Sequence, residues 1–281
     1  MHGDPAWDKR PCLGCRHSRV TDRTLSKRVI AVAHDRRRRL TAIIAALVLG
    51  TGLAACAAGP DVAGPAPRPV EDAHLPPGVD TTFRWAATGV LDPQSAEGTF
   101  VRAFTESFEL ANAGRSVRWG YPGFVEAAPS NIDQMVTAYP TDSSTGREVG
   151  TAFYSALRRV DDNGWVRIVL CRHGYRSVQR AGGWFVGFDT PRPVEIDIRR
   201  VGDDPAAATR GGERTPGADV FGGWFTSRYD FAALYPTPTA DQKSCAALTP
   251  AGMPHWLPAA ATEPWPSLSP SPGWSSYPGA A

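Results

Sequence analysis

The sequence predicts an α+β fold, with one or two N-terminal helices followed by an antiparallel sheet between residues 81 and 245. Three observations predict this fold class. Phenylalanines recur every four residues early in this range, the apolar period changes to two beyond residue 150, and an Asn-Gly pair separates two apolar runs. Helices followed by a series of strands are typical of α+β domains.

The helical part begins at Asp92-Pro93, which we interpret as the N-cap and the first helical residue. Phe100, Phe104 and Phe108 then form one apolar face, and Gly114 ends the helix. Residues 119–128 could form a second short helix, although Pro122-Gly123 weakens this prediction.

Predicted strands lie on both sides of the hairpin signal Asn163-Gly164. In the last strand we expect Phe225, Tyr229 and Phe231 to share one face, because side chains alternate between the two faces of a strand. The predicted strands are residues 151–160, 165–171, 184–186, 194–199 and 224–231.

The N-terminal region predicts export. Four arginines at residues 36–39 precede a 16-residue uncharged run, which is shorter than the ~20 residues of a spanning helix and is typical of a signal peptide. The last four residues, Leu53-Ala54-Ala55-Cys56, resemble the lipobox of bacterial lipoproteins. The resemblance implies that residues 29–55 are removed and that Cys56 is lipidated on the outer face of the cytoplasmic membrane. An uncleaved anchor helix is the alternative.

Residues 1–28 precede this signal peptide, and a start at Val29 or Val32 would leave them untranslated. They contain Cys12 and Cys15 with His17, a spacing that some metal sites use. Because no second ligand pair lies nearby, we predict neither a metal site nor a cofactor.

Charge separates the leader from the rest of the chain. Residues 1–55 contain 11 Lys+Arg and 4 Asp+Glu, whereas residues 56–281 contain 19 and 24, a net charge of −5. This acidic balance argues against nucleic acid as a partner. The single lysine after residue 55 and the abundant Ala, Pro and Gly are typical of a high-GC, actinobacterial coding sequence.

Two cysteines remain after Cys56, and in an oxidising compartment they most simply form one Cys171–Cys245 disulfide. The segments on either side of the domain lack a hydrophobic period. Residues 56–80 therefore read as an extended Pro/Ala/Gly tether, and residues 246–281 as a disordered Pro/Ser/Trp-rich tail. The tail tryptophans could alternatively contact a cell-wall polymer or a protein, or fold back onto the domain.

The order of elements, the Phe100/Phe104 helix and the last strand at Gly222-Gly223-Trp224-Phe225 resemble the NTF2-like family over residues 91–232. The resemblance implies that the N-terminal helices pack on a strongly bent antiparallel sheet, which forms a cone around a pocket. Some members of that family are enzymes with acid/base residues in the cone, and many have no catalytic role. The segment 202–218 before the last strand is a departure from the family pattern.

Candidate site residues are few. His173 could pair with Cys171 only if the cysteine were reduced, and we expect His173 to lie outside any deep pocket. Glu195 and Asp197 share one strand face and could act as acid and base inside a cone, but a solvated face with ion pairs to Arg158, Arg172 or Arg228 is the favoured interpretation.

Three aromatic residues, Trp119, Tyr121 and Phe124, could line the mouth of an apolar pocket, although a core cluster explains them more simply. We therefore expect an exported, lipid-anchored envelope protein that binds a protein partner or a small apolar ligand without catalysis. An NTF2-like hydrolase or isomerase using Asp197 or His173 is one alternative, and a structural subunit of an envelope or secretion apparatus is another.

Overall fold

A computed structural model describes residues 75–138, 146–205, 211–231 and 239–275. The predicted leader, the predicted lipidation site Cys56 and most of the predicted tether lie outside the described residues. Within them, no helix is both long and apolar enough to cross a membrane.

A sheet of seven strands runs through the described residues, and its long central hairpin is formed by β2 (Glu148–Asp162) and β3 (Trp165–Arg180). Asn163 and Gly164 connect them with φ of 41° and 85°, the left-handed backbone that an Asn-Gly hairpin turn requires. The other strands are β1 (Val79–Ala86), β4 (Gly183–Phe188), β5 (Arg192–Arg199), β6 (Phe225–Asp230) and β7 (Ala260–Ala261).

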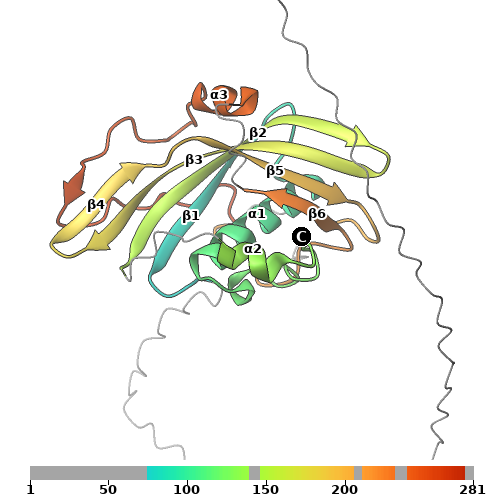
Figure 1. The fold of residues 1–281 in the computed structure, drawn as a ribbon, viewed down its shortest axis with the longest axis horizontal. Helices are drawn as coiled ribbons and strands as arrows, with labels where there is room; N and C mark the ends of the chain where they lie inside the picture. The colour runs from blue at the N-terminus through green and yellow to red at the C-terminus, as the bar shows by residue number, and fades with distance from the viewer. Residues whose placement is uncertain (1–74, 139–145, 206–210, 232–238, 276–281) are drawn as a thin grey trace, which may run out of the picture. The chain divides into compact units, whose positions relative to one another are not determined.

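Strand β3 has two different partners along its length. Its first half, residues 165–172, pairs with β5, and its second half, residues 175–180, pairs with β4. Figure 1 shows the sheet arching over α1 and α2, while α3 lies on its opposite face. We call these the inner and the outer face.

The expectation of an antiparallel sheet is correct for every strand pair except one. Strand β1 pairs with β2 in parallel, so the sheet is mixed. This strand begins at Val79, inside the predicted tether, and Phe83 and Trp85 of β1 are buried on the inner face. The α+β class is therefore established, with a strand rather than a helix as the first element.

Helix α1 (Ala96–Ala113) is almost entirely buried beneath the sheet. The N-cap is Ser95, whose hydroxyl accepts from the Gly98 amide, whereas the predicted cap Asp92 caps only the turn before it by accepting from Gln94. Gly114 ends the helix, as predicted. The helix contributes Phe100, Phe104 and Phe108 to the core, where their rings contact Phe221, Phe124 and Tyr229.

The predicted helix at residues 119–128 is wrong. A single 3₁₀ turn, η1 (Val117–Trp119), is followed by turns in which Gly120 is extended and Gly123 has φ of 87°. The second helix is α2 (Ile132–Ala138), in a stretch whose short length hides its apolar period. Only Ile132 and Val136 of α2 are buried.

A bulge alters the expected faces of β6. The pairing changes between Asp197 and Ile198, so that Ser227 has no opposite residue. Tyr229 consequently packs in the core while Phe225 is exposed on the other face. The strand thus has the predicted position, but Phe225 does not share the face of Tyr229.

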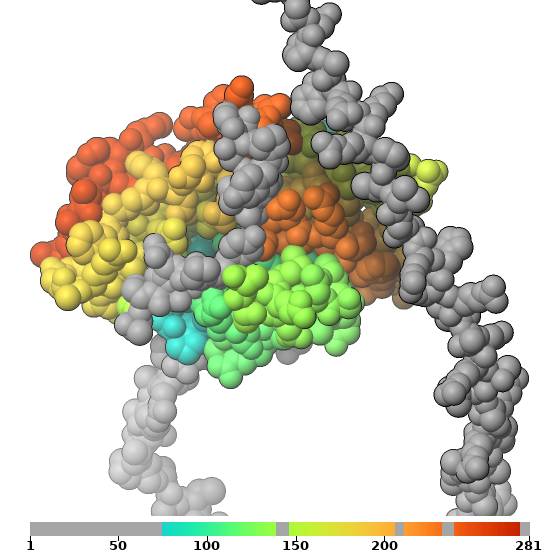
Figure 2. Space-filling view, in the orientation of Figure 1, coloured from blue at the N-terminus to red at the C-terminus, as the bar shows by residue number. Residues whose placement is uncertain are grey.

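The C-terminal segment, residues 247–275, differs from the predicted disordered tail. It follows α3 (Ala240–Ala246), contributes β7 to the edge of β4, and ends with Trp274 in the core. Figure 2 shows its orange-to-red residues packed directly against the yellow strands. The segment has no periodic pattern because it is ordered by bonds to the sheet, such as those from the Trp265 and Leu268 amides to Ser177 and Thr151 hydroxyls.

Candidate functional site

The inner face contains a buried polar cluster centred on the Glu106 carboxylate of α1. Its side chain is 2% exposed. Oε1 accepts from the indole Nε1–H of Trp85 at 2.7 Å, and Oε2 accepts from the Tyr121 hydroxyl at 2.7 Å and from the Trp274 indole Nε1–H at 2.8 Å. Three donors from distant parts of the chain therefore meet at one carboxylate.

Arg102 lies one helical turn before Glu106 and completes the cluster. Its Nε is 3.7 Å from Glu106 Oε1, its Nη2 donates to the Pro272 carbonyl at 2.8 Å, and its guanidinium lies 4.1 Å from the Trp274 ring centroid. No part of Arg102 is exposed. A buried arginine of this kind needs a paired charge, and Glu106 provides it, although Arg102 Nε itself has no hydrogen-bond partner. We call Arg102, Glu106, Tyr121, Trp85 and Trp274 the Glu106 cluster.

Trp274 reaches this cluster by crossing the free edge of the sheet. The Ser271 amide donates to the Phe83 carbonyl and the Trp85 amide donates to the Ser271 carbonyl, which extends the sheet beyond β1. The Trp274 and Glu213 main chains then bond to each other, with the Trp274 ring 2% exposed. Residues 271–274 thus close the inner face from the side of β1.

Burial dominates the electrostatics of the cluster. It raises the pKa of Glu106, against the opposing effects of Arg102 and the three donors, and it lowers the pKa of Arg102. The pair is an ion pair that water does not reach. Its chemical role in this conformation is to hold aromatic groups around α1.

A second polar network lies further along the inner face. Arg172 donates to Glu109 at 2.6 Å and to Asp189 at 2.7 Å, and the Tyr154 hydroxyl donates to Glu109 at 2.6 Å. Burial alone would raise the pKa values of Glu109 and Asp189, but Arg172 and its neighbouring arginines hold both pKa values below their ordinary range. Both carboxylates are therefore charged and paired.

Two pockets adjoin residues 270–273 of the C-terminal segment, and Trp85 and Ser271 line both. The first, about 440 Å³, lies beside the Glu106 cluster and is also lined by Pro93, Gly211 and Pro272. The second, about 490 Å³, is lined mainly by carbon and lies between the end of β1, the middle of β2 and residues 248–251. We call the first the edge pocket and the second the outer groove.

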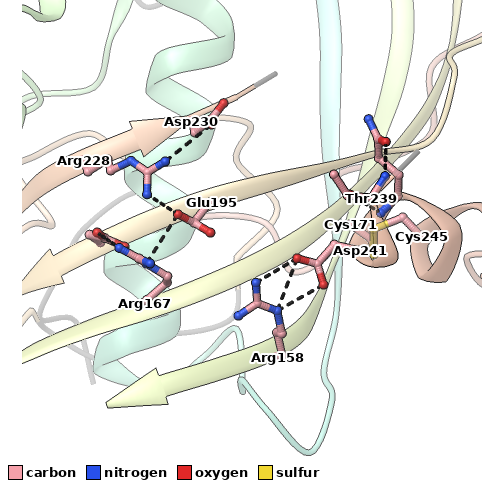
Figure 3. Close-up of polar contacts among 11 residues, drawn as sticks. Arg158, Arg167, Cys171, Glu195, Arg228, Asp230, Thr239, Asp241 and Cys245 are labelled. Carbon is pink, nitrogen blue, oxygen red and sulfur yellow. Dashed lines mark hydrogen bonds and ion pairs between the residues drawn. A yellow bond between two sulfur atoms is a disulfide. The ribbon is translucent and has the colours of Figure 1, made fainter. Parts of the chain in front are cut away.

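Glu195 and Asp197 lie on the outer face, as the favoured interpretation expects, but they are not freely exposed. Arg167 forms two 2.7 Å bonds to Asp197 and lies 3.4 Å from Glu195, which also accepts from Arg228. Figure 3 shows Glu195 between Arg167 and Arg228, with Asp230 beyond. Cross-strand arginines cover both carboxylates, so Asp197 is only 7% exposed.

The predicted arginine partners are only partly correct. Arg228 pairs with Glu195, but Arg158 pairs with Asp241 of α3, and Arg172 lies on the inner face. The register of β3 against β5 explains this, because it places Arg167 directly opposite Asp197.

Cys171 and Cys245 form a disulfide, with an S–S distance of 2.02 Å and a Cα–Cα distance of 5.2 Å. This is the pair that the cysteine count predicts. The bond fixes α3 to the middle of β3, beside the Arg158–Asp241 pair (Figure 3). Both cysteines are completely buried.

His173 lies beneath the same helix. Its Nε2 is 2.9 Å from the Cys245 carbonyl oxygen, and burial lowers its pKa. The expectation that it lies outside any deep pocket holds for the two pockets described above, but the ring is 2% exposed and is not a solvated surface group. Since Cys171 is oxidised, the pair has no thiolate.

The aromatic trio does not line a pocket mouth. Tyr121 and Phe124 are buried in the core, and Trp119 packs against it from the surface. Neither described pocket includes any of the three. The simpler interpretation, a core cluster, is correct for Tyr121 and Phe124.

The sequence pointed to Tyr121, but the other residues of the Glu106 cluster were not predicted. Arg102 and Glu106 are four residues apart on a helix whose other buried positions are mostly apolar or small, and this spacing of opposite charges was an available signal. The sequence around Trp274 contained no signal for this role beyond the residue type itself. In the described part of the chain, no group of three His, Cys, Asp or Glu side chains is arranged to hold a metal ion.

Comparison with known proteins adds no assignment. No family model, no curated protein and no solved structure matches this chain.

Proposed function

We propose that this chain is an exported, lipid-anchored binding module with an NTF2-like cone, which takes up a small apolar ligand in the outer groove. The observation that carries the proposal is the groove itself. It is about 490 Å³, within the range of small-molecule sites, and it lies on a sheet whose other described pocket is smaller and more polar.

The lining of the groove favours an apolar ligand. Phe153 of β2, Leu157 at the β2 bulge and Leu248 of the C-terminal segment present carbon to it. Arg84 lies at its side, where its Nη1 donates to the Ser269 carbonyl. Such a site gains affinity from buried apolar area rather than from a specific ion pair.

The state of the acidic side chains supports a binding role. Glu106, Glu109, Asp189, Glu195 and Asp197 each have an arginine within ion-pair distance. A general acid or base needs a side chain that reaches the substrate and exchanges its proton. None of these five lines the outer groove.

Anchoring at Cys56 suits this role. Fewer than 20 residues separate Cys56 from Leu75, and a proline-rich chain extends by about 3.1 Å per residue, so the domain would lie within roughly 60 Å of the membrane. A protein in that position can take up an apolar molecule from the bilayer surface or deliver one to it.

The groove is tested with Nile red as the apolar probe, added to the purified protein. We expect fluorescence enhancement in the wild type and its loss in Ala251→Trp, which places a large ring in the lining. Ala247→Trp is the matched control, because Ala247 is also exposed and lies four residues earlier without lining the groove. Equal binding by all three proteins would refute the site.

The anchor is tested separately by Cys56→Ser in cells. We expect the protein to leave the membrane fraction or to keep its leader. Unchanged processing and partitioning would refute lipidation and leave the groove proposal intact.

A further inference from the structure

We propose that the Glu106 cluster is a second, latent binding site for a planar aromatic ligand with an N–H donor, and that Trp274 occupies it as an internal ligand. The proposal concerns the inner face and goes beyond the outer groove. It rests on the contacts of Trp274, on how residues 271–274 are held, and on the edge pocket beside them.

The contacts of Trp274 are those of a recognised ligand. The indole N–H donates to Glu106 Oε2 at 2.8 Å, one ring face meets the Arg102 guanidinium at 4.1 Å, and the ring meets Tyr121 edge-on at a centroid distance of 5.8 Å. The carboxylate selects a ligand with an N–H donor, and the guanidinium selects a planar aromatic ring. Tyr121 limits where that ring can lie. An apolar core position needs none of these.

Most of the receptor side of the site is assembled by residues outside the Trp274 segment, although Arg102 Nη2 also donates to the Pro272 carbonyl of that segment. Glu106 and Arg102 belong to α1, and the two other donors to Glu106 come from Trp85 of β1 and from Tyr121. Tyr121 is fixed by its own amide, which donates to the Ser107 hydroxyl. Removal of Trp274 would therefore leave an organised carboxylate with one free acceptor position.

The segment that carries Trp274 is held at an edge. Ser271 adds one bridge beside β1, and residues 273 and 274 add two short bridges to residues 211 and 213. Short edge pairings open more easily than the interior of a sheet. The edge pocket, about 440 Å³, is lined by residues 270–273 on one side and by Pro93 and Trp85 on the other, and gives a ligand a route to the same place.

The probe is indole, and the first measurement is hydrogen exchange of the wild-type protein during an indole titration. We expect indole to bind and to increase exchange at the amides of Trp85, Ser271 and Trp274, about fivefold or more, because a ligand that replaces Trp274 favours the open edge. Trp85 and Trp274 report directly, since their amides bond to Ser271 and Glu213.

The second measurement removes the internal competitor. We expect Trp274→Ala to bind indole about tenfold more tightly than the wild type, and to bind 1-methylindole about tenfold more weakly than indole, because the methylated ring cannot donate to Glu106. Trp256→Ala is the control, since Trp256 is the exposed tryptophan of the same segment. Ala251→Trp, with a filled outer groove, is expected to bind indole like the wild type.

A permanent core tryptophan gives a different pattern. In that case Trp274→Ala binds indole in the vacated space, but indole does not increase exchange at Trp85, Ser271 and Trp274 of the wild type, even if it enters the outer groove, and this result would overturn the proposal. Equal affinity of Trp274→Ala for indole and 1-methylindole would overturn the assigned ligand chemistry. If Trp274→Ala does not fold, the hydrogen-exchange titration of the wild type with indole tests the proposal by itself.

Discussion

The inner and the outer face of the sheet use the same residue types in opposite ways. On the inner face Arg102 and Glu106 are buried and three donors from distant parts of the chain converge on the Glu106 carboxylate. On the outer face Arg228 is about half exposed and shares Glu195 with Arg167. Burial, rather than the number of ion pairs, decides how much each charged group contributes to the free energy of unfolding. The loss of one partner leaves an uncompensated charge only where water is excluded.

The largest expected effect is the loss of the Glu106 carboxylate. Glu106→Ala leaves Arg102 and three donors unpaired in the core, so we expect a loss of about 3–5 kcal/mol in unfolding free energy. For a domain of this size, this lowers the thermal midpoint by roughly 10 °C. Glu195→Ala is the matched control on the outer face, with an expected loss below about 1 kcal/mol. Equal losses from the two variants would remove the distinction between the faces.

The disulfide is the strongest single stabilising bond that we expect on the outer face. Cys171 and Cys245 are separated by 74 residues, and their bond restricts the unfolded chain. We expect the double variant Cys171→Ala/Cys245→Ala to lose about 2–4 kcal/mol in a denaturant titration. Arg158→Ala, which removes the neighbouring ion pair of α3, is the comparison. A larger loss from Arg158→Ala would show that charge pairing fixes α3.

His173 gives the outer face a pH dependence. Burial lowers the pKa of His173 below the ordinary value of 6.5, so the unfolded chain binds the proton more readily. Its contribution to stability is present above pH 6.5 and is lost as the pH falls below that value towards the lowered pKa of the folded state. Urea titrations of wild type and His173→Phe should diverge in this range, and the same pH slope in both proteins would exclude His173 as its source.

The smallest effect is expected for Arg228, the half-exposed arginine of the outer face. Arg228→Ala removes contacts to Glu195 and Asp230, both screened by water, and we expect a change within about 0.5 kcal/mol. Raising the salt concentration should reduce even this difference. A loss comparable to that of Glu106→Ala would contradict the comparison of the two faces.

The elements with a local sequence signal, such as a hydrophobic period or a turn motif, were predictable from the sequence. The elements without such a signal were not. The helix with Phe100, Phe104 and Phe108 and the hairpin at Asn163-Gly164 carry local signals, and both are in the structure. The disulfide followed from cysteine parity. Strand β1 was missed because Val79 follows a proline-rich stretch and its partner in β2 is some 70 residues away.

The Glu106 cluster shows the same limit more clearly. The buried charges are four residues apart on α1, but their aromatic partners come from β1, from the turn after η1 and from the C-terminal segment. No local rule connects Trp274 with Glu106, 168 residues earlier. The prolines around Trp274 suggested disorder, whereas in the structure this segment is ordered by bonds to the edge of β1.

The closure of the inner face by Trp274 is tested most directly by hydrogen exchange of the tryptophan indole N–H groups, observed by NMR on ¹⁵N-labelled protein without added ligand. The structure predicts strong protection for the Trp274 Nε1–H, which is bonded to Glu106, and rapid exchange for the exposed Trp256 as internal control. Glu106→Ala should remove the protection of Trp274 and leave Trp256 unchanged. A Trp274 indole that exchanges as fast as that of Trp256 in the wild type would contradict the account.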